Sequence, residues 1–359
     1  MRKVMSLSLA MLLLVLALAG CGGGTTGDKS ADPAPSQPTG TQPSTDETAP
    51  DKPEFTLRIA HAHALDSMTG QCMTKMGDMI TEYSGGRIAC EYYPAGQLGD
   101  KIANMEGLRS GTVDMTECAA TDMSAFKSRW SVFSLPFMYA DADEALKVFS
   151  NPEVIKILDM DCQEAGMKLV SMQNVGSRSL INSKRPINEP ADCKGLKIRS
   201  LQDKYIARGM ELMGFGVVAL GWTEVYPALQ QGTIDGADNS APFIADGGFY
   251  EICKYYSVTE AVRLPDPILM SKSFYDGLPS DLQEAVDKAG QDFMEWQWTF
   301  YTEYEQKSID VLKENEVEIN EITPENRQKF LEATMPVYDE LFKDIPDARE
   351  LYETFEAAK

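Results

Sequence analysis

The stretch GLKIRSLQDKYIARGMELMGFGVVALGWTEVYPALQQGTIDGADNS, residues 195–240, decides the fold. It alternates short apolar runs with helix-like segments, which indicates the strand-and-helix units of an α/β sheet. Arg199 ends the first predicted strand, Trp222 opens a predicted helix, and Asn239 follows a later strand. Groups at such strand-to-helix corners commonly build small-ligand clefts. We therefore predict that Arg199 binds a carboxylate here, because its planar fork of N–H donors matches the two carboxylate oxygens.

A second α/β unit precedes this stretch. Its predicted strands, which alternate with two helices, are 55–62, 87–96 and 113–120. This order predicts a sheet with parallel crossings. His61 and Ala119 lie near the ends of two of these strands, so we expect them to supply the other half of the cleft. The extended stretch 167–182 contains Arg178 and is long enough to pass from one lobe of a two-lobed protein into the other.

A long helix follows near the C-terminus. A strand is predicted at 268–272, and no proline interrupts the chain from Asp281 to about Lys313, where Gly290 is the only glycine. Ser280 is the predicted N-cap, with Gln283 three residues on. A helix of about 30 residues spans about 45 Å, enough to run along both lobes. Thr323 and Pro324 predict the start of a further helix, and a last amphipathic helix closes the chain.

Chain length and net charge limit the classes of protein to which this chain can belong. The chain has 359 residues, which is long for one domain and allows about two. Its formal charge is −22, which disfavours nucleic acid and anionic lipid headgroups as partners. A small anion is still compatible with this charge, because one local arginine can outweigh a diffuse field that salt screens.

Cysteine and histidine usage argues against a zinc site. The seven cysteines form no CxxC pair, and the chain has only two histidines. Six cysteines remain when Cys21 is set aside; they could form disulfides outside the cytoplasm, or serve as small buried hydrophobic residues. The motifs GxSxG and HExxH and the P-loop are also absent, so we predict that the protein is not an enzyme.

The N-terminus has the pattern of a lipoprotein leader. Residues 1–20 combine a basic start with a short apolar run, which is typical of a signal peptide rather than a spanning helix. Residues 18–21 read LAGC, which resembles a bacterial lipobox and implies acylation of Cys21. Residues 21–54 are rich in Gly, Ser, Thr and Pro, so we predict a disordered tether. The protein is therefore expected outside the cytoplasm, lipid-anchored to the cell membrane in the periplasm or at the cell surface.

Several segments together resemble a known family, the DctP-like solute-binding proteins of TRAP (tripartite ATP-independent periplasmic) transporters. They are YPAGQLGD at 93–100, SLPFMYAD at 134–141, and the run from NSKRPINEPADCKGLKIRS through ALGWTEVYPALQQGTIDGADNS to FYEICKYYSVT. The similarity extends over about residues 55–345. It implies an α/β, two-lobed, class II periplasmic-binding-protein-like fold with a long hinge-spanning C-terminal helix. We assign residues 55–175 and about 265–304 to lobe I, and residues 176–264 and about 305–359 to lobe II.

The resemblance also implies a function and a set of site residues. Family members mostly bind organic acids through one arginine and pass them to membrane permease subunits of the transporter. Arg199 falls at the position of that arginine, Asn239 at the asparagine of a DGQEN motif, and Trp222 at a pocket position. Arg178 aligns with a second arginine found near the ligand in several members. A histidine of the family is replaced here, which leaves Glu260 as the candidate polar group at that corner.

Three questions stay open on the sequence alone: uptake or sensing, the presence of a cation, and the identity of the ligand. A ligand-presenting sensory lipoprotein, serving a chemoreceptor or histidine kinase, is the alternative to an uptake protein, and the two differ little in sequence. Some family members hold a divalent cation beside the ligand carboxylate, but no residue here places a metal or another cofactor. The ligand candidates are 2-oxo or 2-hydroxy monocarboxylates, short dicarboxylates, aromatic acids and acidic sugars.

Overall fold

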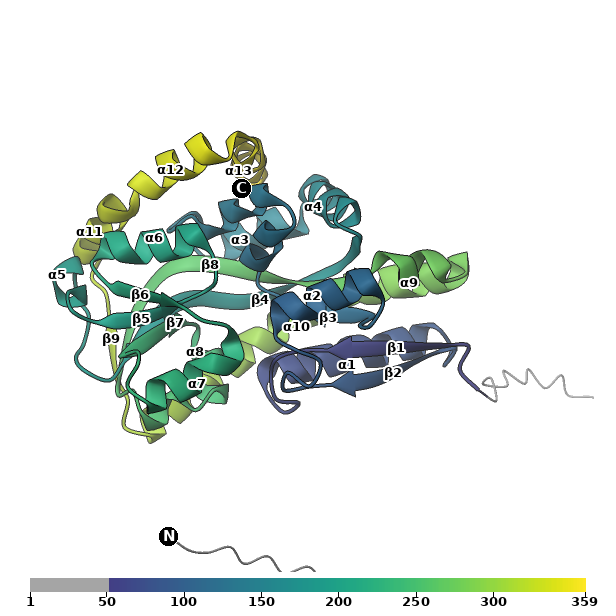
Figure 1. Ribbon diagram of the computed structural model, residues 1–359, viewed down its shortest axis with the longest axis horizontal. Coiled ribbons are helices and arrows are strands. Elements are labelled where there is room, and N and C mark those ends of the chain that lie inside the picture. Colours follow the sequence, from purple (N-terminus) through teal and green to yellow (C-terminus); the bar gives the residue numbers. More distant parts are fainter. Residues whose placement is uncertain (1–51) are drawn as a thin grey trace, which may run out of the picture. The chain divides into compact units, whose positions relative to one another are not determined.

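The computed structural model describes residues 52–359, which form a mixed α/β structure (Figure 1). The predicted signal peptide 1–20, Cys21 and nearly all of the predicted tether 21–54 lie outside the described residues. Within 52–359, none of the helices has both the length and the apolar character needed to cross a membrane.

One sheet organises the described chain. Its order is β2-β1-β3-β8-β4-β7-β5-β6, and β9 pairs with β8. The strands are β1 Phe55–Ala60, β2 Ile88–Tyr93, β3 Met115–Glu117, β4 Met167–Asn182, β5 Lys197–Ser200, β6 Gly216–Ala219, β7 Gly236–Asn239, β8 Tyr255–Ser271 and β9 Glu318–Glu321. β1 pairs in parallel with both β2 and β3, and β5 with both β6 and β7. The parallel crossings predicted for the N-terminal unit are therefore confirmed.

The antiparallel strands β4 and β8 join the two parallel halves of the sheet. Their shared register runs from the pair Met167–Ser271 to the pair Asn182–Tyr255. The ladder shifts register around Gly176, whose φ of 77° is readily adopted only by glycine. The predicted strand 268–272 is only the end of β8. Sequence underestimated its length because two prolines interrupt the run, although pairing with β4 continues across them.

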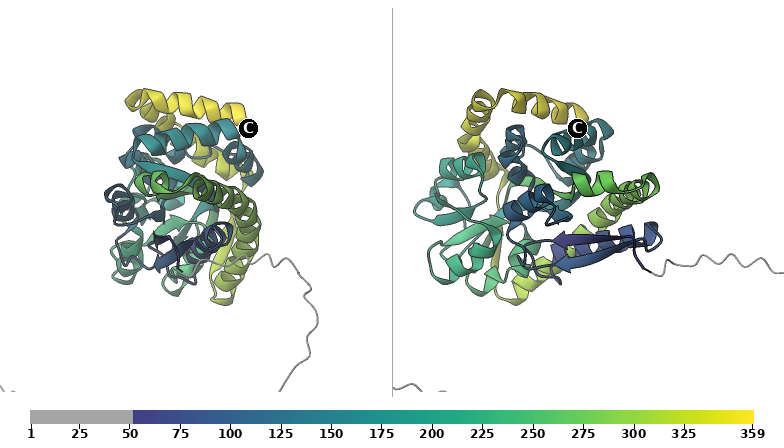
Figure 2. Two further views of the ribbon diagram at one scale, coloured as in Figure 1. Left: turned by 90° about the vertical axis from the view of Figure 1, so that its right-hand side faces the viewer. Right: turned by 45° about the vertical axis from the view of Figure 1, so that its right-hand side comes forward.

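Helices cover both faces of this sheet (Figure 2). They are α1 Met68–Tyr83, α2 Lys101–Ser110, α3 Ala142–Ser150, α4 Pro152–Glu164, α5 Pro190–Cys193, α6 Lys204–Met213, α7 Trp222–Gln230, α8 Ala241–Asp246, α9 Lys272–Gly277, α10 Ser280–Glu314, α11 Pro324–Thr334, α12 Pro336–Asp344 and α13 Pro346–Ala358, with 3₁₀ turns η1 Ala120–Ala125, η2 Ser128–Ser134 and η3 Phe249–Glu251. Local capping explains several boundaries: the Asp100 carboxylate begins α2, Gly111 ends it in the left-handed conformation, and Thr323 caps α11.

The long predicted helix is α10, which is 35 residues long. It packs against β4, α1 and α8, and thus against elements of both predicted lobes. The predicted cap at Ser280 is wrong: Pro279 is the N-cap residue and Ser280 is the first helical residue. The Gln283 amide donates instead to the carbonyls of Tyr275 in α9 and of Leu278, the C-cap residue of α9.

The C-terminal helices lie beside α6, α3 and η2 (Figure 1). In the aromatic cluster under α13, the ring centroid of Phe355 is 5.2 Å from that of Phe133 and 6.4 Å from that of Phe149. α13 therefore rests on residues of the predicted lobe I, while α11 and α12 contact α6 of the predicted lobe II. The lobe boundaries stay a prediction.

The six cysteines within the described residues are all free thiols. Five of them are buried, and Cys90 is partly buried. Burial raises the pKa of Cys72, Cys193 and Cys253 to about 12. Of the two alternatives left open by the sequence, the structure supports small buried hydrophobic residues.

Candidate ligand-binding site

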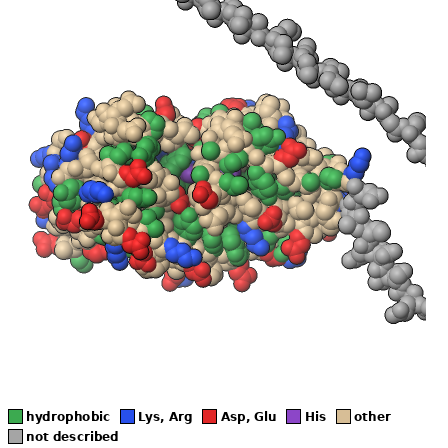
Figure 3. Space-filling view, turned by 90° about the horizontal axis from the view of Figure 1, so that it is seen from below, with side chains coloured by type: hydrophobic (Ala, Val, Ile, Leu, Met, Phe, Trp, Pro, Cys, Tyr) green, Lys and Arg blue, Asp and Glu red, His purple; other side chains and the backbone are tan. Residues whose placement is uncertain are grey.

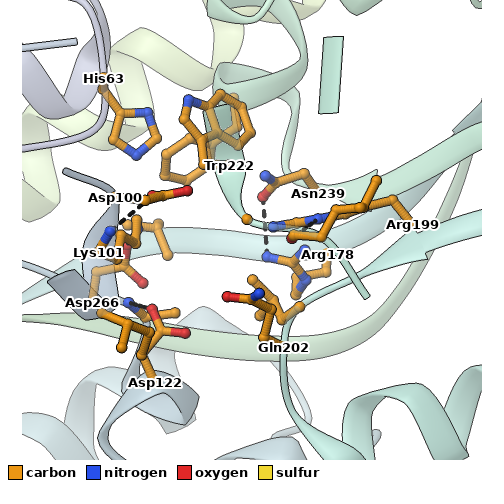
Figure 4. A pocket seen from close by; sticks show the side chains of 17 residues that line it. His63, Asp100, Lys101, Asp122, Arg178, Arg199, Gln202, Trp222, Asn239 and Asp266 are labelled. Atoms are coloured by element: carbon orange, nitrogen blue, oxygen red, sulfur yellow. Dashed lines mark hydrogen bonds and ion pairs between the residues drawn. The ribbon is translucent and has the colours of Figure 1, made fainter. Parts of the chain in front are cut away.

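A narrow cavity lies where β5, β7 and β4 approach η1 and α2 (Figure 4). Its volume is about 60 Å³, well below the several hundred Å³ of typical small-molecule sites. Five predicted residues line it: Arg199, Asn239, Trp222, Arg178 and Ala119. They come from five different places in the fold, namely β4, β5, α7, β7 and the start of η1, so the fold brings together most of the set that the sequence singled out.

Arg199 offers a guanidinium that is only partly used by the described residues 52–359. The residue is 3% exposed, and its Nε donates to the carbonyl of Leu220 at 3.0 Å. Within residues 52–359 its two terminal nitrogens have no acceptor, and no carboxylate lies within ion-pair distance of the side chain. Burial, and then the charge of Arg178, lowers the pKa of Arg199 to about 10. Arg199 is therefore still charged at neutral pH, with a free fork of donors.

Arg178 is occupied by the neighbouring strand. Its Nε donates to Asp238 Oδ2 at 2.6 Å, and its Nη2 donates to Asp238 Oδ1 at 3.0 Å and to the Asp238 carbonyl at 2.6 Å. Its Nη1 donates to Asn239 Oδ1 at 3.2 Å. Asp238 stands where the DGQEN motif of the family has a glutamate, and its carboxylate holds Arg178 in position.

Asn239 and Trp222 provide a donor and an apolar wall. The Oδ1 of Asn239 accepts from Arg178 and from the Ser240 N–H at 3.0 Å, which leaves its amide group as a donor. The Trp222 ring packs against His63, Phe243 and Phe249, with centroids 4.8, 5.7 and 5.5 Å away. As predicted, Trp222 opens a helix, and it also lines the cavity.

The opposite wall carries a buried ionic network. Lys101 Nζ donates to Glu117 Oε2 at 2.8 Å and to Asp266 Oδ2 at 3.2 Å. Burial disfavours the charge of Lys101, but Asp266 and Glu117 more than offset this, so the pKa of Lys101 is raised. Asp122 Oδ2 accepts from the Ala119 N–H at 2.9 Å, and burial raises the pKa of Asp122 to about 6.

The two histidines lie in different places relative to the cavity. His63 lines the cavity, with its Nε2 3.5 Å from Glu117 Oε1, and burial holds the pKa of His63 well below its usual value. The predicted His61 does not line the cavity. It is fully buried beside β1, and burial lowers its pKa to about 4. Both histidines are thus neutral at physiological pH. Figure 3 shows little exposed histidine on the face of the molecule that it draws.

Glu260 also lies away from this cavity. It occupies an irregular point of β8 with φ at 46°, where its N–H donates to Ser179 Oγ and its carboxylate lies 3.6 Å from Arg263. The side chain borders a different groove, beside α10 and β9. We expected Glu260 to face the ligand because it lies near the position of the missing histidine. The irregular strand instead directs its side chain to the groove beside α10 and β9.

Sequence reasoning missed a group of cavity residues: His63, Asp100, Lys101, Asp122, Gln202, Phe243 and Asp266. Asp100 and Lys101 belong to the YPAGQLGDK segment, whose helix-start pattern could have marked them. The acidic wall had no comparable local signal, because Asp122 and Asp266 are distant in the chain. Within residues 52–359, no cluster of three or more histidine, cysteine or acidic side chains has the arrangement of a metal site.

Comparison with known proteins identifies the family. Residues 59–344 match the DctP model, described as bacterial extracellular solute-binding protein, family 7. The chain belongs to this family. Among DctP-family relatives, the uncharacterized protein YiiZ of Salmonella typhimurium is 32% identical over 309 residues, covering 85% of this chain and 92% of that protein. The C4-dicarboxylate-binding periplasmic protein DctP of Rhodobacter capsulatus is 26% identical over 291 residues, covering 80% and 87%.

A solved structure supports the same assignment. A TRAP periplasmic solute-binding protein from a Sulfitobacter species, crystallised with β-D-galacturonate, superposes with a TM-score of 0.80 at 30% identity. The match covers 84% of this chain and 99% of that protein. The predicted fold class, the two-lobed α/β architecture of the DctP family, is confirmed by this similarity.

Proposed function

We propose that the protein is the extracytoplasmic binding component of a TRAP-type transporter and captures an organic acid through Arg199. The observation that carries this proposal is a buried arginine whose two terminal nitrogens have no acceptor within residues 52–359 and line a cavity. A buried charge without a partner is costly. A ligand carboxylate supplies that partner with two parallel hydrogen bonds, and the Asn239 amide donates to another ligand oxygen.

Capture involves closure of two lobes over the acid. In the proposed division, lobe I is 55–175 with about 265–304, and lobe II is 176–264 with about 305–359. Asp100 Oδ2 accepts from the Thr223 hydroxyl at 3.3 Å across the rim of the cavity, a bond between these lobes. The cavity is too narrow for most organic acids as it stands, so the lobes must separate for entry and exit. Bonds made only in the closed form bias the protein toward it when ligand is bound.

Delivery of the bound acid to the membrane depends on the lipid anchor and the tether. Acylation of Cys21 anchors the protein to the cell membrane, and the tether to residue 54 leaves the binding domain free to reach permease subunits. Those subunits accept the acid from the closed domain. Metabolic labelling with a fatty-acid analogue tests the anchor, since Cys21→Ala should abolish incorporation while leaving ligand binding unchanged.

Substitution of Arg199 tests the carboxylate grip. A thermal-shift screen of organic acids, amino acids and sugars, with and without calcium, first identifies a ligand, because stabilisation rises with ligand excess over Kd. Arg199→Lys should then weaken binding about 100-fold by calorimetry, since lysine keeps the charge but loses the paired donors. Arg349→Lys, at an exposed position on α13, is the matched control and should bind as the wild type does. Affinity retained in Arg199→Lys would remove Arg199 from the central role.

A further inference from the structure

The charged groups of the cavity are divided between two walls (Figure 4). Arg199 and Arg178 lie on one side, on β5 and β4. Asp122 on η1 and Asp266 on β8 lie on the other side. A ligand that spans the cavity therefore meets a basic wall at one end and an acidic wall at the other.

Only one cation of this cavity is free of an ion-pair partner within the described chain. Arg178 is held by Asp238, with its Nε 2.6 Å from Oδ2. Lys101 is shared between Glu117 and Asp266, at 2.8 and 3.2 Å, so a single ammonium faces two carboxylates. Arg199 alone remains, and it can neutralise one ligand carboxylate.

The acidic wall keeps unused acceptors. Asp266 has a side chain 5% exposed and bonds Lys101 through Oδ2, while its Oδ1 has no donor within residues 52–359. Asp122 accepts through Oδ2 from the Ala119 N–H, and its Oδ1 likewise has no donor among the described residues. Ionised carboxylates only accept hydrogen bonds, so a ligand must present donors to this wall.

We infer that Asp122 and Asp266 determine the ligand specificity: they accept hydrogen bonds from ligand hydroxyl groups and repel a second carboxylate, so the protein prefers hydroxylated monocarboxylates to dicarboxylates. This inference rests on the proposed function, in which Arg199 holds the first carboxylate. A dicarboxylate would place its second charge beside two acids, with no free cation among the described residues, and like-charge contacts of this kind weaken binding. The Rhodobacter capsulatus relative is named for C4-dicarboxylates; this chain should differ from it in that respect.

Galactonate and galactarate are matched probes for this inference. They share a six-carbon polyhydroxylated chain and one carboxylate, and differ only in whether the far end is a hydroxymethyl group or a second carboxylate. Calorimetry on the purified protein at neutral pH should give at least about 100-fold tighter binding of galactonate. Wild-type protein that binds galactarate as tightly as galactonate would overturn the inference and leave the proposed function standing.

Substitution of Asp122 and Asp266 tests whether these two side chains cause the preference for galactonate. Asp122→Asn and Asp266→Asn are made separately. Each should lower the ratio of the affinity for galactonate to the affinity for galactarate about tenfold, because each removes one repulsive charge and keeps an acceptor oxygen. Glu295→Gln, at an exposed position on α10, removes the same charge far from the wall and should keep the wild-type ratio. Arg199→Lys should weaken both probes alike. A ratio unchanged in both aspartate variants overturns the assignment.

The remaining outcomes separate the two proposals. If neither probe binds but another organic acid does in the thermal-shift screen, the specificity inference fails and the proposed function stands. If no organic acid binds at all, both fail. Asp122→Asn preserves the Lys101 ion pairs and so gives a readable result even if Asp266→Asn does not fold.

Discussion

Replacement of Gly290 by alanine tests how closely α10 is packed on the sheet. A Cβ at Gly290 would lie 2.1 Å from the carbonyl oxygen of Val170 in β4, while real Cβ contacts essentially never fall below 3.0 Å. Strand and helix must therefore move apart by at least 0.9 Å, the difference between these values. The Gly290 carbonyl also accepts from Ser171 Oγ at 2.8 Å, a buried bond that this displacement would weaken.

The expected loss follows from three contributions. Overpacking costs about 1–3 kcal/mol, and a weakened buried hydrogen bond costs about 1 kcal/mol. Alanine regains up to about 1 kcal/mol through its helix propensity. We expect Gly290→Ala to lower the free energy of unfolding by about 2 kcal/mol, which corresponds to a Tm lower by about 3 °C for a folded body of about 300 residues.

Urea and thermal unfolding of matched variants measure this loss. Gly277→Ala is the control, because a Cβ at Gly277, at the end of α9, meets no atom within 4 Å. That variant should be as stable as the wild type or slightly more stable. If Gly290→Ala is as stable as Gly277→Ala, α10 does not pack against β4 at this distance, and the account of how it lies along the two halves of the sheet is wrong.

Two further predictions concern Asp203, which is buried, and Asp122, which is partly buried. Asp203 Oδ1 accepts from the backbone N–H of Tyr205 and from Ser134 Oγ at 2.7 Å, so Asp203→Ala should lower the free energy of unfolding in urea by about 2–3 kcal/mol. Asp203→Asn should recover most of this loss. A loss below about 0.5 kcal/mol in Asp203→Ala would contradict the role of Asp203 as the N-cap residue of α6. Burial raises the pKa of Asp122 to about 6 from 3.8, so the folded state binds the proton more tightly and ionisation destabilises it as pH rises from about 4 to 6. Asp122→Asn should therefore be more stable than the wild type at pH 7, with an advantage that shrinks by pH 4; an equal difference at both pH values would refute this.

Several elements of the fold, one site residue and the family could be predicted from the sequence alone. A helix between the strands 87–96 and 113–120 and the extended stretch 167–182 were both predicted, because capping residues and side-chain periodicity act over a few positions. Arg199 was recognisable for a similar reason, since it ends a short strand next to a predicted helix. The family was also readable from motifs that stand in order along the chain, and the match over 59–344 confirms it.

Only the tertiary structure decided which polar groups face one another. The register of β4 against β8, with its shifts near Gly176, sets which side chains reach the cavity, and a change of one residue in a strand reverses the face. That register turns Glu260 away and brings Asp266 in. Asp238 holds Arg178 and leaves Arg199 free because β7 pairs with β4, a contact between residues 60 positions apart. Such pairings depend on how the whole sheet is assembled, so no local pattern in the sequence encodes them.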